Sequence, residues 1–329
     1  LKKEKKSIIQ FNQNNKKIFE SSICPVPCDV VVQEKPNGMA GAILAAKKYI
    51  QGKRILSMIA DDIADPTLIQ DILKVVRPDI FGVLAAWKPK DYFPGGYIVF
   101  RDGGEPIGIR EKPGKGNTPS EYVYFGGQYI ENADILVEAI EDVGIKSDDV
   151  YEQALSKLMK THRFSLVPYD NDFVSLKYPW HVLDVLDYLF SHRFSPGRGN
   201  NVDIRNNVSI EGQVYIGNKV KIFENTKIVG PVYIGDNTII GSNNIIRESM
   251  IGAHCVTGFN TDIARSYIGD NCWFHSNYIG DSVLEGNVSM GAGSVLANFR
   301  LDEKEIRDTN RTKLGAMIAR DVRIGVNAS

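Results

Sequence analysis

The sequence has little cysteine, and that excludes two classes of protein. Only four of its 329 residues are cysteines, which is too few for a disulfide scaffold in a chain of this length. Cys24 and Cys28 flank a Pro-Val-Pro segment, and no second cysteine or histidine pair follows at zinc-finger spacing. Cys255 and Cys272 lie far away in the sequence. We expect a reducing, cytoplasmic location.

Membrane segments and a strong net charge are also missing. No uncharged apolar run is long enough to cross a bilayer, and the first ten residues, LKKEKKSIIQ, lack the apolar core of a signal peptide. The 39 Lys and Arg residues balance 40 Asp and Glu residues, for a formal net charge of −1. A balanced charge gives no field for holding nucleic acid or anionic lipid. We therefore expect small molecules or other copies of the chain as partners, and neither nucleic acid nor a membrane.

What the sequence does contain is enough apolar material for two domains. Hydrophobic residues make up 43% of the 329 residues. Single hydrophobic cores rarely grow beyond about 250–300 residues, so the length favours two domains. The Gly- and Pro-rich segment SPGRGN at residues 195–200 marks the boundary. We place the first domain at residues 1–195 and the second at 201–329.

The second domain contains a six-residue repeat. Isoleucine recurs at eight successive positions of this period: Ile204, Ile210, Ile216, Ile222, Ile228, Ile234, Ile240 and Ile246. Six residues is not a helical period, and hairpins break the chain every eight to twelve residues. A prism of short parallel strands explains the period, with one hexapeptide on each of three faces. Each isoleucine is then expected to point inward and to stack on the next coil.

The repeat is interrupted in two places and then ends. It breaks at residues 249–265 and again in the polar stretch 298–313, where we expect loops to leave the prism. The sequence stops shortly after Ile324, with no helix or polar cap to cover the last coil. An uncapped solenoid exposes an apolar edge. We therefore expect further residues to follow Ser329 in the natural protein.

The first domain alternates short apolar runs with helix-forming segments. Residues 30–33, 54–59 and 81–87 are predicted strands, and residues 40–50 and 68–76 are predicted helices. This alternation predicts an α/β domain with a mostly parallel sheet covered by helices on both faces. Ligands of such sheets bind beyond the carboxyl ends of the strands, where Gln33 and Asp61 fall.

Five short motifs of this domain carry a family resemblance. They are QEKPNGMAG (33–41), ADD (60–62), FGV (81–83), EKP (111–113) and GQY (127–129). In this order they resemble sugar-1-phosphate nucleotidylyltransferases. With the prism attached, the chain resembles the bifunctional type, the UDP-N-acetylglucosamine pyrophosphorylases that also carry an amino-sugar-1-phosphate N-acetyltransferase domain. The resemblance implies a Rossmann-like α/β nucleotidyltransferase domain with a mixed sheet, followed by an all-β left-handed parallel β-helix of hexapeptide repeats.

The resemblance implies transfer of a nucleotidyl group from UTP or dTTP to a sugar-1-phosphate. Catalysis of that step is positioning and charge neutralisation by Mg²⁺. Gln33 and Gly38 would contact the pyrimidine base, and Asp61 would hold the metal. Four more residues would contact the sugar phosphate: Gly82, Glu111, Lys112 and Gly127. Each motif alone also has a plainer interpretation, such as a helix cap for residues 61–62 or a solvated turn for 111–113.

Two departures from the family pattern bear on this step. The family begins with a glycine-rich loop containing Gly-Thr-Arg, which cradles the triphosphate, and the present sequence starts downstream of it. We therefore expect inefficient nucleotidyl transfer by residues 1–329 alone. In many relatives the motif Trp-x-Asp-x-Gly-Thr-Pro supplies a second metal ligand. Ser175 stands in that place, which leaves Asp170 or Asp172 as candidates.

His275 differs from the other histidines by its neighbours in the sequence. Tyr278, Asn298 and Lys304 follow it by 3, 23 and 29 residues, and Ser289 lies in the next repeat. These spacings match the acetyltransferase site of the bifunctional family. The other four histidines have the simpler interpretation of structural residues: His162, His181, His192 and His254.

Acetyl transfer explains why these residue types occur together. An amino sugar must lose a proton to attack the thioester of acetyl-CoA, and an imidazole accepts it near neutral pH. Backbone N–H groups of residues 291–293 are candidate donors to the tetrahedral oxyanion. Lys304 and Arg307 are candidate cations for the sugar phosphate, with Arg265 near a lysine position of bacterial relatives. Asn298 would orient the base or the substrate. The family also implies a homotrimer through the β-helix, with sites between neighbouring prisms.

Three hypotheses on function remain open from the sequence. The first is a bifunctional enzyme of nucleotide-sugar biosynthesis with both transfers. The second is an acetyltransferase with a degenerate nucleotidyltransferase domain. The third is a non-catalytic assembly or regulatory subunit. Retention of Gln33, Asp61, Glu111 and the residues around His275 favours the first hypothesis.

Overall fold

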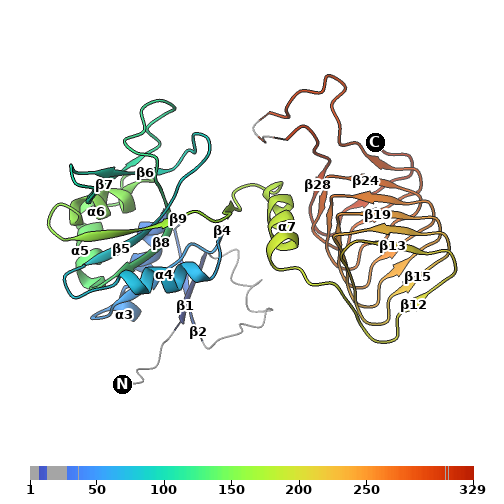
Figure 1. Cartoon of the computed structure of the whole chain (residues 1–329), viewed down its shortest axis with the longest axis horizontal. Coiled ribbons are helices and arrows are strands. Elements are labelled where there is room, and N and C mark those ends of the chain that lie inside the picture. The colour runs from blue at the N-terminus through green and yellow to red at the C-terminus, as the bar shows by residue number, and fades with distance from the viewer. Residues whose placement is uncertain (1–6, 13–27, 36, 308, 310) are drawn as a thin grey trace. The chain divides into compact units, whose positions relative to one another are not determined.

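The structure is a computed structural model that describes residues 7–12, 28–35, 37–307, 309 and 311–329 (Figure 1). Cys24, which we singled out above, lies outside the described residues. Contacts divide the chain into two compact units, Leu1–Phe173 and Val174–Ser329. This division groups the helix α7 (His181–His192) with the second unit, whose column of strands begins at Gly197. The domain limits 1–195 and 201–329 stay a prediction. Within the described part of the chain, no helix has the length and apolar composition that crossing a membrane requires.

A mixed six-stranded sheet forms the centre of the first unit. Its strands are β7 (Pro106–Glu111), β6 (Gly96–Phe100), β8 (Val123–Ile130), β5 (Gly82–Trp87) and β9 (Phe164–Tyr169) in this order, with β3 (Ile55–Ser57) paired to β8. Only β5 and β9 are parallel, whereas β8 runs antiparallel to β3, β5 and β6. The mixed sheet is confirmed, and our expectation of a mostly parallel sheet is wrong. The hairpin of β6 and β7 inserts antiparallel strands that the strand–helix alternation does not show.

Helices cover both faces of this sheet, and β5 contributes side chains to both sides. Leu84 and Ala86 pack into one cluster with α5 (Ala133–Val143) and α6 (Val150–Leu158). Val83 and Ala85 pack into another cluster with Leu68 and Ile72 of α4 (Thr67–Val75). A strand that is buried on both faces is apolar at every position, as residues 82–86 are. The remaining elements of the unit are β1 (Ser7–Asn12) and β2 (Cys28–Gln33), a parallel pair, α2 (Gly38–Ala45), α3 (Lys47–Ile50) and β4 (Asp62–Ile63).

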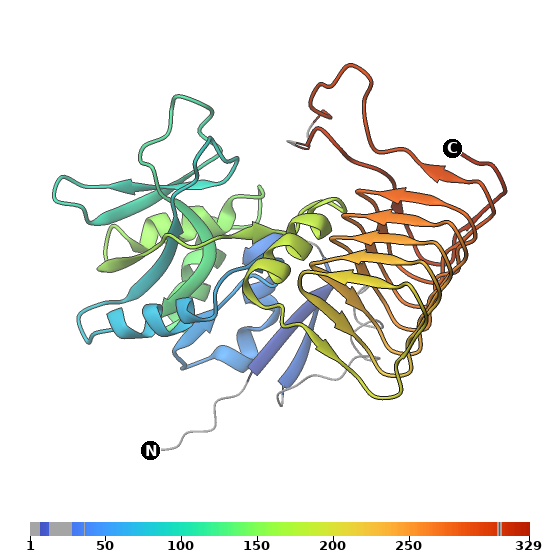
Figure 2. The same cartoon turned by 45° about the vertical axis from the view of Figure 1, so that its right-hand side comes forward.

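The second unit is a column of short parallel strands on three faces (Figure 2). After β10 (Val174–Ser175) and α7, the first face holds β11 (Gly197–Arg198), β14 (Val214–Ile216), β17 (Val232–Ile234), β20 (Met250–Ile251), β23 (Tyr267–Ile268), β25 (Val283–Leu284) and β28 (Met317–Ile318). The second face holds β12 (Asp203–Ile204), β15 (Lys221–Ile222), β18 (Ile239–Ile240), β21 (Val256–Thr257), β26 (Ser289–Met290) and β29 (Arg323–Ile324). The third face holds β13 (Ser209–Glu211), β16 (Lys227–Val229), β19 (Ile245–Arg247), β22 (Asp262–Ala264), β24 (Tyr278–Gly280) and β27 (Val295–Leu296). The hexapeptide β-helix is confirmed.

The isoleucines of the repeat form the core of the column. Ile216, Ile222, Ile228, Ile234, Ile240 and Ile246 are all buried, and Ile216 pairs in register with Ile234 eighteen residues later. Ile204 is partly buried against the same core, and Ile210 is 39% exposed. Both lie in the first coil of the column, so only the coil above covers them. The inward orientation is therefore confirmed for the six that have coils on both sides.

The first interruption of the repeat is not a loop. Strands β20, β21 and β22 continue the column through residues 250–264, and the register shortens from eighteen residues to seventeen between Tyr233 and Met250. A coil that is one residue shorter shifts the phase of the pattern while the chain stays on the column. Our expectation of a loop at residues 249–265 is therefore wrong. The second interruption is confirmed: between β27 and β28 the chain leaves the column as a long loop with two isolated bridges, at Phe299–Lys313 and Ile306–Arg311.

Candidate functional site

The two residues predicted to contact a base lie together in the first unit. Gln33 ends β2, Gly38 begins α2, and the Gln33 side-chain amide donates to the Gly38 carbonyl oxygen at 3.3 Å. A methyl group on Gly41 would lie only 2.3 Å from Nε2 of Gln33. Glycine at position 41 therefore leaves room for the Gln33 amide over the first turn of α2.

Glu111 lies beside a second carboxyl group. It ends β7 opposite Gly96 of β6, which in turn pairs with Tyr124 of β8. A methyl group on Gly96 would lie 3.1 Å from Oε2 of Glu111 and 3.7 Å from Cγ of Glu152 in α6. Gly96 thus keeps the space beside both carboxyl groups open. Our sequence analysis missed Gly96 and Glu152, although the Pro-Gly-Gly run at 94–96 was a signal for the glycine.

The surroundings of Glu152 favour its protonated form. Burial raises the pKa of Glu152 to about 7, and the negative charges of Glu111, Asp149 and Asp148 add to the effect. Near neutral pH this carboxyl group is therefore about half protonated and is able to donate as well as accept a hydrogen bond. The group beside Glu111 is thus suited to bind hydroxyl or amide groups of a sugar.

Two aspartates follow β3, and they differ in exposure. Asp61 is exposed in the turn before β4, whereas Asp62 is half-buried and its charge contributes to the raised pKa of Tyr124. Lys112 forms an ion pair with Glu111 at 3.4 Å. Among the described residues, no three His, Cys, Asp or Glu side chains form a group able to hold a metal alone. Mg²⁺ commonly takes one or two carboxylates and completes its shell with phosphate oxygens and water, and an exposed Asp61 fits that chemistry.

Two predicted glycines have packing neighbours instead. Gly82 lies at the amino-terminal end of β5, where a methyl group would lie 2.2 Å from the Phe164 ring. A methyl group on Gly127 in β8 would lie 3.2 Å from Cβ of Ala85 and 3.3 Å from Sδ of Met58. The contact with Phe164 requires glycine at position 82, and the contacts at position 127 are tight. Gly82 lies at the amino-terminal end of β5, beside Ile130 at the carboxyl end of the antiparallel β8. Their contacts with substrate stay a prediction.

In the second unit, Tyr278 and Asn298 lie together on the third face of the column. The Tyr278 hydroxyl donates to Oδ1 of Asn298 at 3.3 Å, and Asn298 is only 8% exposed. His275 is exposed at the corner between the second and third faces, directly after the buried Phe274. Ser289 begins β26 on the second face. These four predicted residues therefore lie around one corner of the column and do not line a single pocket.

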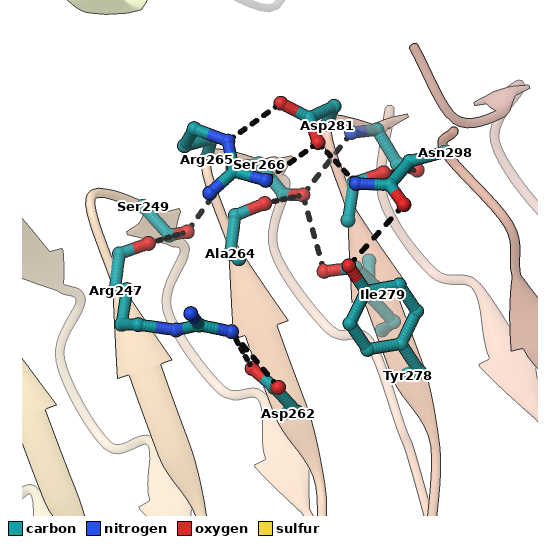
Figure 3. A network of polar contacts seen from close by, with 12 residues as sticks. Arg247, Ser249, Asp262, Ala264, Arg265, Ser266, Tyr278, Ile279, Asp281 and Asn298 are labelled. Atoms are coloured by element: carbon teal, nitrogen blue, oxygen red, sulfur yellow. Dashed lines mark hydrogen bonds and ion pairs between the residues drawn. The ribbon is translucent and has the colours of Figure 1, made fainter. Parts of the chain in front are cut away.

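A buried carboxylate that was not predicted from the sequence connects Arg265 with Asn298 (Figure 3). Nε and Nη2 of Arg265 donate to the two oxygens of Asp281 at 2.7 and 2.8 Å, and Nδ2 of Asn298 donates to the same carboxylate. Asp281 is only 3% exposed, so its charge requires these partners. The bond to Asp281 also raises the pKa of the Arg265 guanidinium. Asn298 donates to Asp281, which Arg265 holds, and accepts from Tyr278. These hydrogen bonds fix the Asn298 amide in one orientation.

A polar groove of about 330 Å³ lies over this network. It is lined by Arg247, Arg265, Tyr278, Asn298, Phe299 and Lys313. Arg247 donates to both oxygens of Asp262 at 2.8 and 2.9 Å (Figure 3), and the Lys313 ammonium lies 5.8 Å from the centre of the Phe299 ring. Asp262 and Asp281 neutralise Arg247 and Arg265, so Lys313 gives the groove its net positive charge, which suits a phosphate group.

Of the three cations that the sequence suggested, Arg265 lines this groove, whereas Lys304 and Arg307 do not. Lys304 and Arg307 are exposed on the long loop, and the groove is lined instead by Arg247, Arg265 and Lys313. Arg247 and Arg265 are eighteen residues apart, which is three hexapeptides. That spacing was the available signal, because it is close to the length of one coil. The coil has seventeen residues here, so Arg247 pairs with Ala264 and Arg265 follows it on the neighbouring coil.

Comparisons with known proteins match both units. Residues 2–172 match the nucleotidyl transferase family, and residues 213–248 match the bacterial transferase hexapeptide repeat. A bifunctional sugar-1-phosphate nucleotidylyltransferase/acetyltransferase of Sulfurisphaera tokodaii is 29% identical over 97% of this chain and 79% of its own. The bifunctional protein GlmU of Methanococcus maripaludis strain C5 is 32% identical over 99% of this chain and 77% of its own. Among solved structures, a UDP-glucose pyrophosphorylase from Acinetobacter baumanii aligns with 55% of this chain and 68% of its own, at a TM-score of 0.44 and 19% identity.

Proposed function

The chain belongs to the family of bifunctional sugar-1-phosphate nucleotidylyltransferases and acetyltransferases, and we propose that it performs both transfers on sugar phosphates. One transfer moves a nucleotidyl group from UTP or dTTP to a sugar-1-phosphate, and the other moves an acetyl group from acetyl-CoA to an amino-sugar-1-phosphate. The observation that carries the proposal is the pairing of Gln33 with Gly38 in one unit and of Tyr278 with Asn298 in the other.

In the nucleotidyl step the protein acts by positioning. The Gln33 amide and the Gly38 backbone bind the base, and Glu111 with the half-protonated Glu152 binds the sugar. Asp61 would hold Mg²⁺, and the metal would supply neutralisation of phosphate charge. The sugar phosphate then attacks the α-phosphorus, and pyrophosphate leaves.

In the acetyl step the protein supplies a base, a binding site for the phosphate and the side-chain amide of Asn298 in a fixed orientation. His275 accepts a proton from the amino group of the sugar as that nitrogen attacks the thioester carbonyl. The C–S bond then breaks, and CoA leaves with a proton on its sulfur as the amide forms. The sugar phosphate binds the cations Arg247, Arg265 and Lys313 in the groove. Asn298, fixed by Asp281, orients the acceptor beside Tyr278.

A single assay tests the two activities separately. The full-length natural protein is incubated with acetyl-CoA, glucosamine-1-phosphate, UTP and Mg²⁺, and CoA and pyrophosphate are measured in parallel. Both products are expected, and EDTA is expected to stop pyrophosphate release while CoA release continues. If CoA is released but no pyrophosphate is released from either UTP or dTTP, the result would support the acetyltransferase hypothesis instead. Neither product would support the assembly or regulatory subunit.

We also propose that three columns associate into a homotrimer around the His275 corner. Large apolar side chains are exposed on both faces that meet there: Phe259 is 60% exposed, Trp273 53% and Ile245 43%. Exposed apolar groups in one area mark interaction surfaces. A neighbouring copy at this corner would also enclose Ser289 and Tyr278, which lie on different faces of one column.

Replacing Trp273 with glutamate is expected to convert the trimer into monomers. A buried unpaired carboxylate opposes association, and CoA release is expected to fall because the corner loses its enclosure. Light scattering after gel filtration measures the mass, at matched protein concentrations. The control is Ile145→Glu, which places the same charge at a 41% exposed position of the first unit. A Trp273→Glu protein with the mass of the wild type would contradict this interface.

A further inference from the structure

A buried asparagine joins the His275 corner to the next coil of the column. Asn277 is 5% exposed, and its Oδ1 accepts the backbone N–H of His275 at 2.7 Å. Its Nδ2 contacts three acceptors on the coil above: the carbonyl oxygen of Gly291 at 2.9 Å, and the carbonyl oxygen and Oγ of Ser294 at 3.0 Å each. One side chain thus contacts the backbone of two neighbouring coils.

These contacts join the two segments that acetyl transfer needs. His275 is the proposed base, and Ala292 carries the candidate N–H donor for the oxyanion, because the Gly291 and Gly293 N–H groups already donate to the carbonyl oxygens of Ile324 and Ser276. Two further bonds support the same arrangement: the Thr261 hydroxyl donates to the His275 carbonyl oxygen, and the Gly293 N–H donates to the Ser276 carbonyl oxygen at 2.9 Å. A buried amide with every polar atom bonded holds its surroundings in one geometry.

We propose that Asn277 is a positioning residue for acetyl transfer. It sets the His275 corner relative to the turn at residues 291–294, and it acts through these segments rather than by touching the substrate. The inference rests on the proposed acetyl transfer. Small displacements of reacting groups cost large factors in rate, about 100-fold for a shift near 1 Å, so the expected effect is on kcat.

The column contains its own control for this role. Asn244 occupies the same position two coils below Asn277, is 1% exposed, and donates from Nδ2 to the carbonyl oxygen of Gly258 at 2.9 Å and to Oγ1 of Thr257 at 2.7 Å. Its Oδ1 accepts the Thr261 N–H at 2.6 Å. Asn244 therefore joins coils as Asn277 does, but it contacts Thr261 and Gly258 and makes no bond to His275 itself.

Threonine at the same column position offers a conservative replacement. The Thr226 hydroxyl donates to the Gly241 carbonyl oxygen at 2.9 Å, and Thr261 makes the equivalent bond to His275. In both cases the threonine hydroxyl donates to a backbone carbonyl oxygen at the corner of the next coil, as the Asn277 amide donates to Gly291. An Asn277→Thr protein is therefore expected to keep the bond to Gly291 and the fold of the column.

The experiment compares three variants with the wild type by CoA release and thermal unfolding. Asn277→Ala is expected to lower kcat about 10- to 100-fold with KM for glucosamine-1-phosphate within about twofold. Asn277→Thr keeps the donor to Gly291 but not the Oδ1 acceptor of the His275 N–H, so it is expected to restore the unfolding temperature and to recover only part of the kcat loss. Asn244→Ala is expected to lower the unfolding temperature as much as Asn277→Ala while it keeps the kcat of the wild type.

Other outcomes separate the possible failures. An equal kcat loss in Asn244→Ala and Asn277→Ala would show a purely structural role and overturn the inference. An unchanged kcat in Asn277→Ala would overturn it as well. A wild type that releases no CoA would instead overturn the proposed acetyl transfer, on which the inference rests.

Discussion

Replacing His275 with alanine is expected to lower CoA release about 10²- to 10⁴-fold, the range that a general base contributes. Without the imidazole, no side chain at this corner takes the proton from the amino group of the sugar as the thioester is attacked. The exposed His275 side chain adds little to the core, because the neighbouring Phe274 is fully buried and fills it. The measurement is CoA release at saturating acetyl-CoA, with pyrophosphate release from the same preparation as the internal standard.

His254→Ala is the matched control for this prediction. His254 is also exposed at a corner of the column, in a coil directly below that of His275, and no catalytic role is predicted for it. Its removal is expected to leave CoA release within about twofold of the wild type, because the strain of alanine at a φ of 58° affects stability and not the His275 corner. Equal rates in wild type and His275→Ala would remove His275 from the mechanism. The groove lined by Arg247 and Lys313 would then be the remaining candidate for the acetyl-transfer site.

The column was predictable because its period is a direct consequence of its geometry. One inward side chain on each face of a three-faced coil gives a period of six, and Ile216 to Ile246 follow it without exception. The same rule explains the failure at residues 249–265. A coil shortened by one residue, as between Tyr233 and Met250, changes the phase but not the fold.

Strand direction in the first unit was not predictable in the same way. Periodicity shows whether a strand is buried, and residues 82–86 show it clearly, but it carries no information about the direction of the neighbouring strand. The antiparallel β8 and the hairpin of β6 and β7 follow from turn geometry and tertiary pairing. The family resemblance implied the mixed sheet where the pattern alone did not.

The acetyl site was predictable only where residues are close to His275 in sequence or on a neighbouring coil. Tyr278 and Asn298 were found by spacing, and the structure joins them by a hydrogen bond. Asp281 was missed because a carboxylate in a repeat is usually exposed, and only the structure shows it buried between Arg265 and Asn298. A buried charge with exact partners is a tertiary property that a linear pattern does not display.

Replacing Asp61 with asparagine is expected to lower pyrophosphate release about 10²- to 10³-fold, which corresponds to about 3–4 kcal/mol of transition-state stabilisation. Asparagine keeps the size and the exposed position of the side chain in the turn before β4 but removes the charge that Mg²⁺ binds. Because a weaker site fills at higher metal concentration, raising Mg²⁺ is expected to restore part of the rate. The measurement is pyrophosphate release from UTP and sugar-1-phosphate by the full-length natural protein across a Mg²⁺ titration.

Two further aspartates decide whether this effect belongs to Asp61. Asp71→Asn, in the exposed ion pair with Lys74 on α4, is expected to leave pyrophosphate release unchanged, because exposed pairs contribute little. Asp62→Asn is the sharper comparison, since its charge acts on the buried Tyr124 beside Glu152. Loss of the Mg²⁺-dependent rate in Asp62→Asn but not in Asp61→Asn would move the metal ligand one residue along the chain, to the half-buried aspartate whose charge acts on Tyr124. Loss in Asp61→Asn alone would place the metal at the exposed turn, where triphosphate oxygens complete its shell.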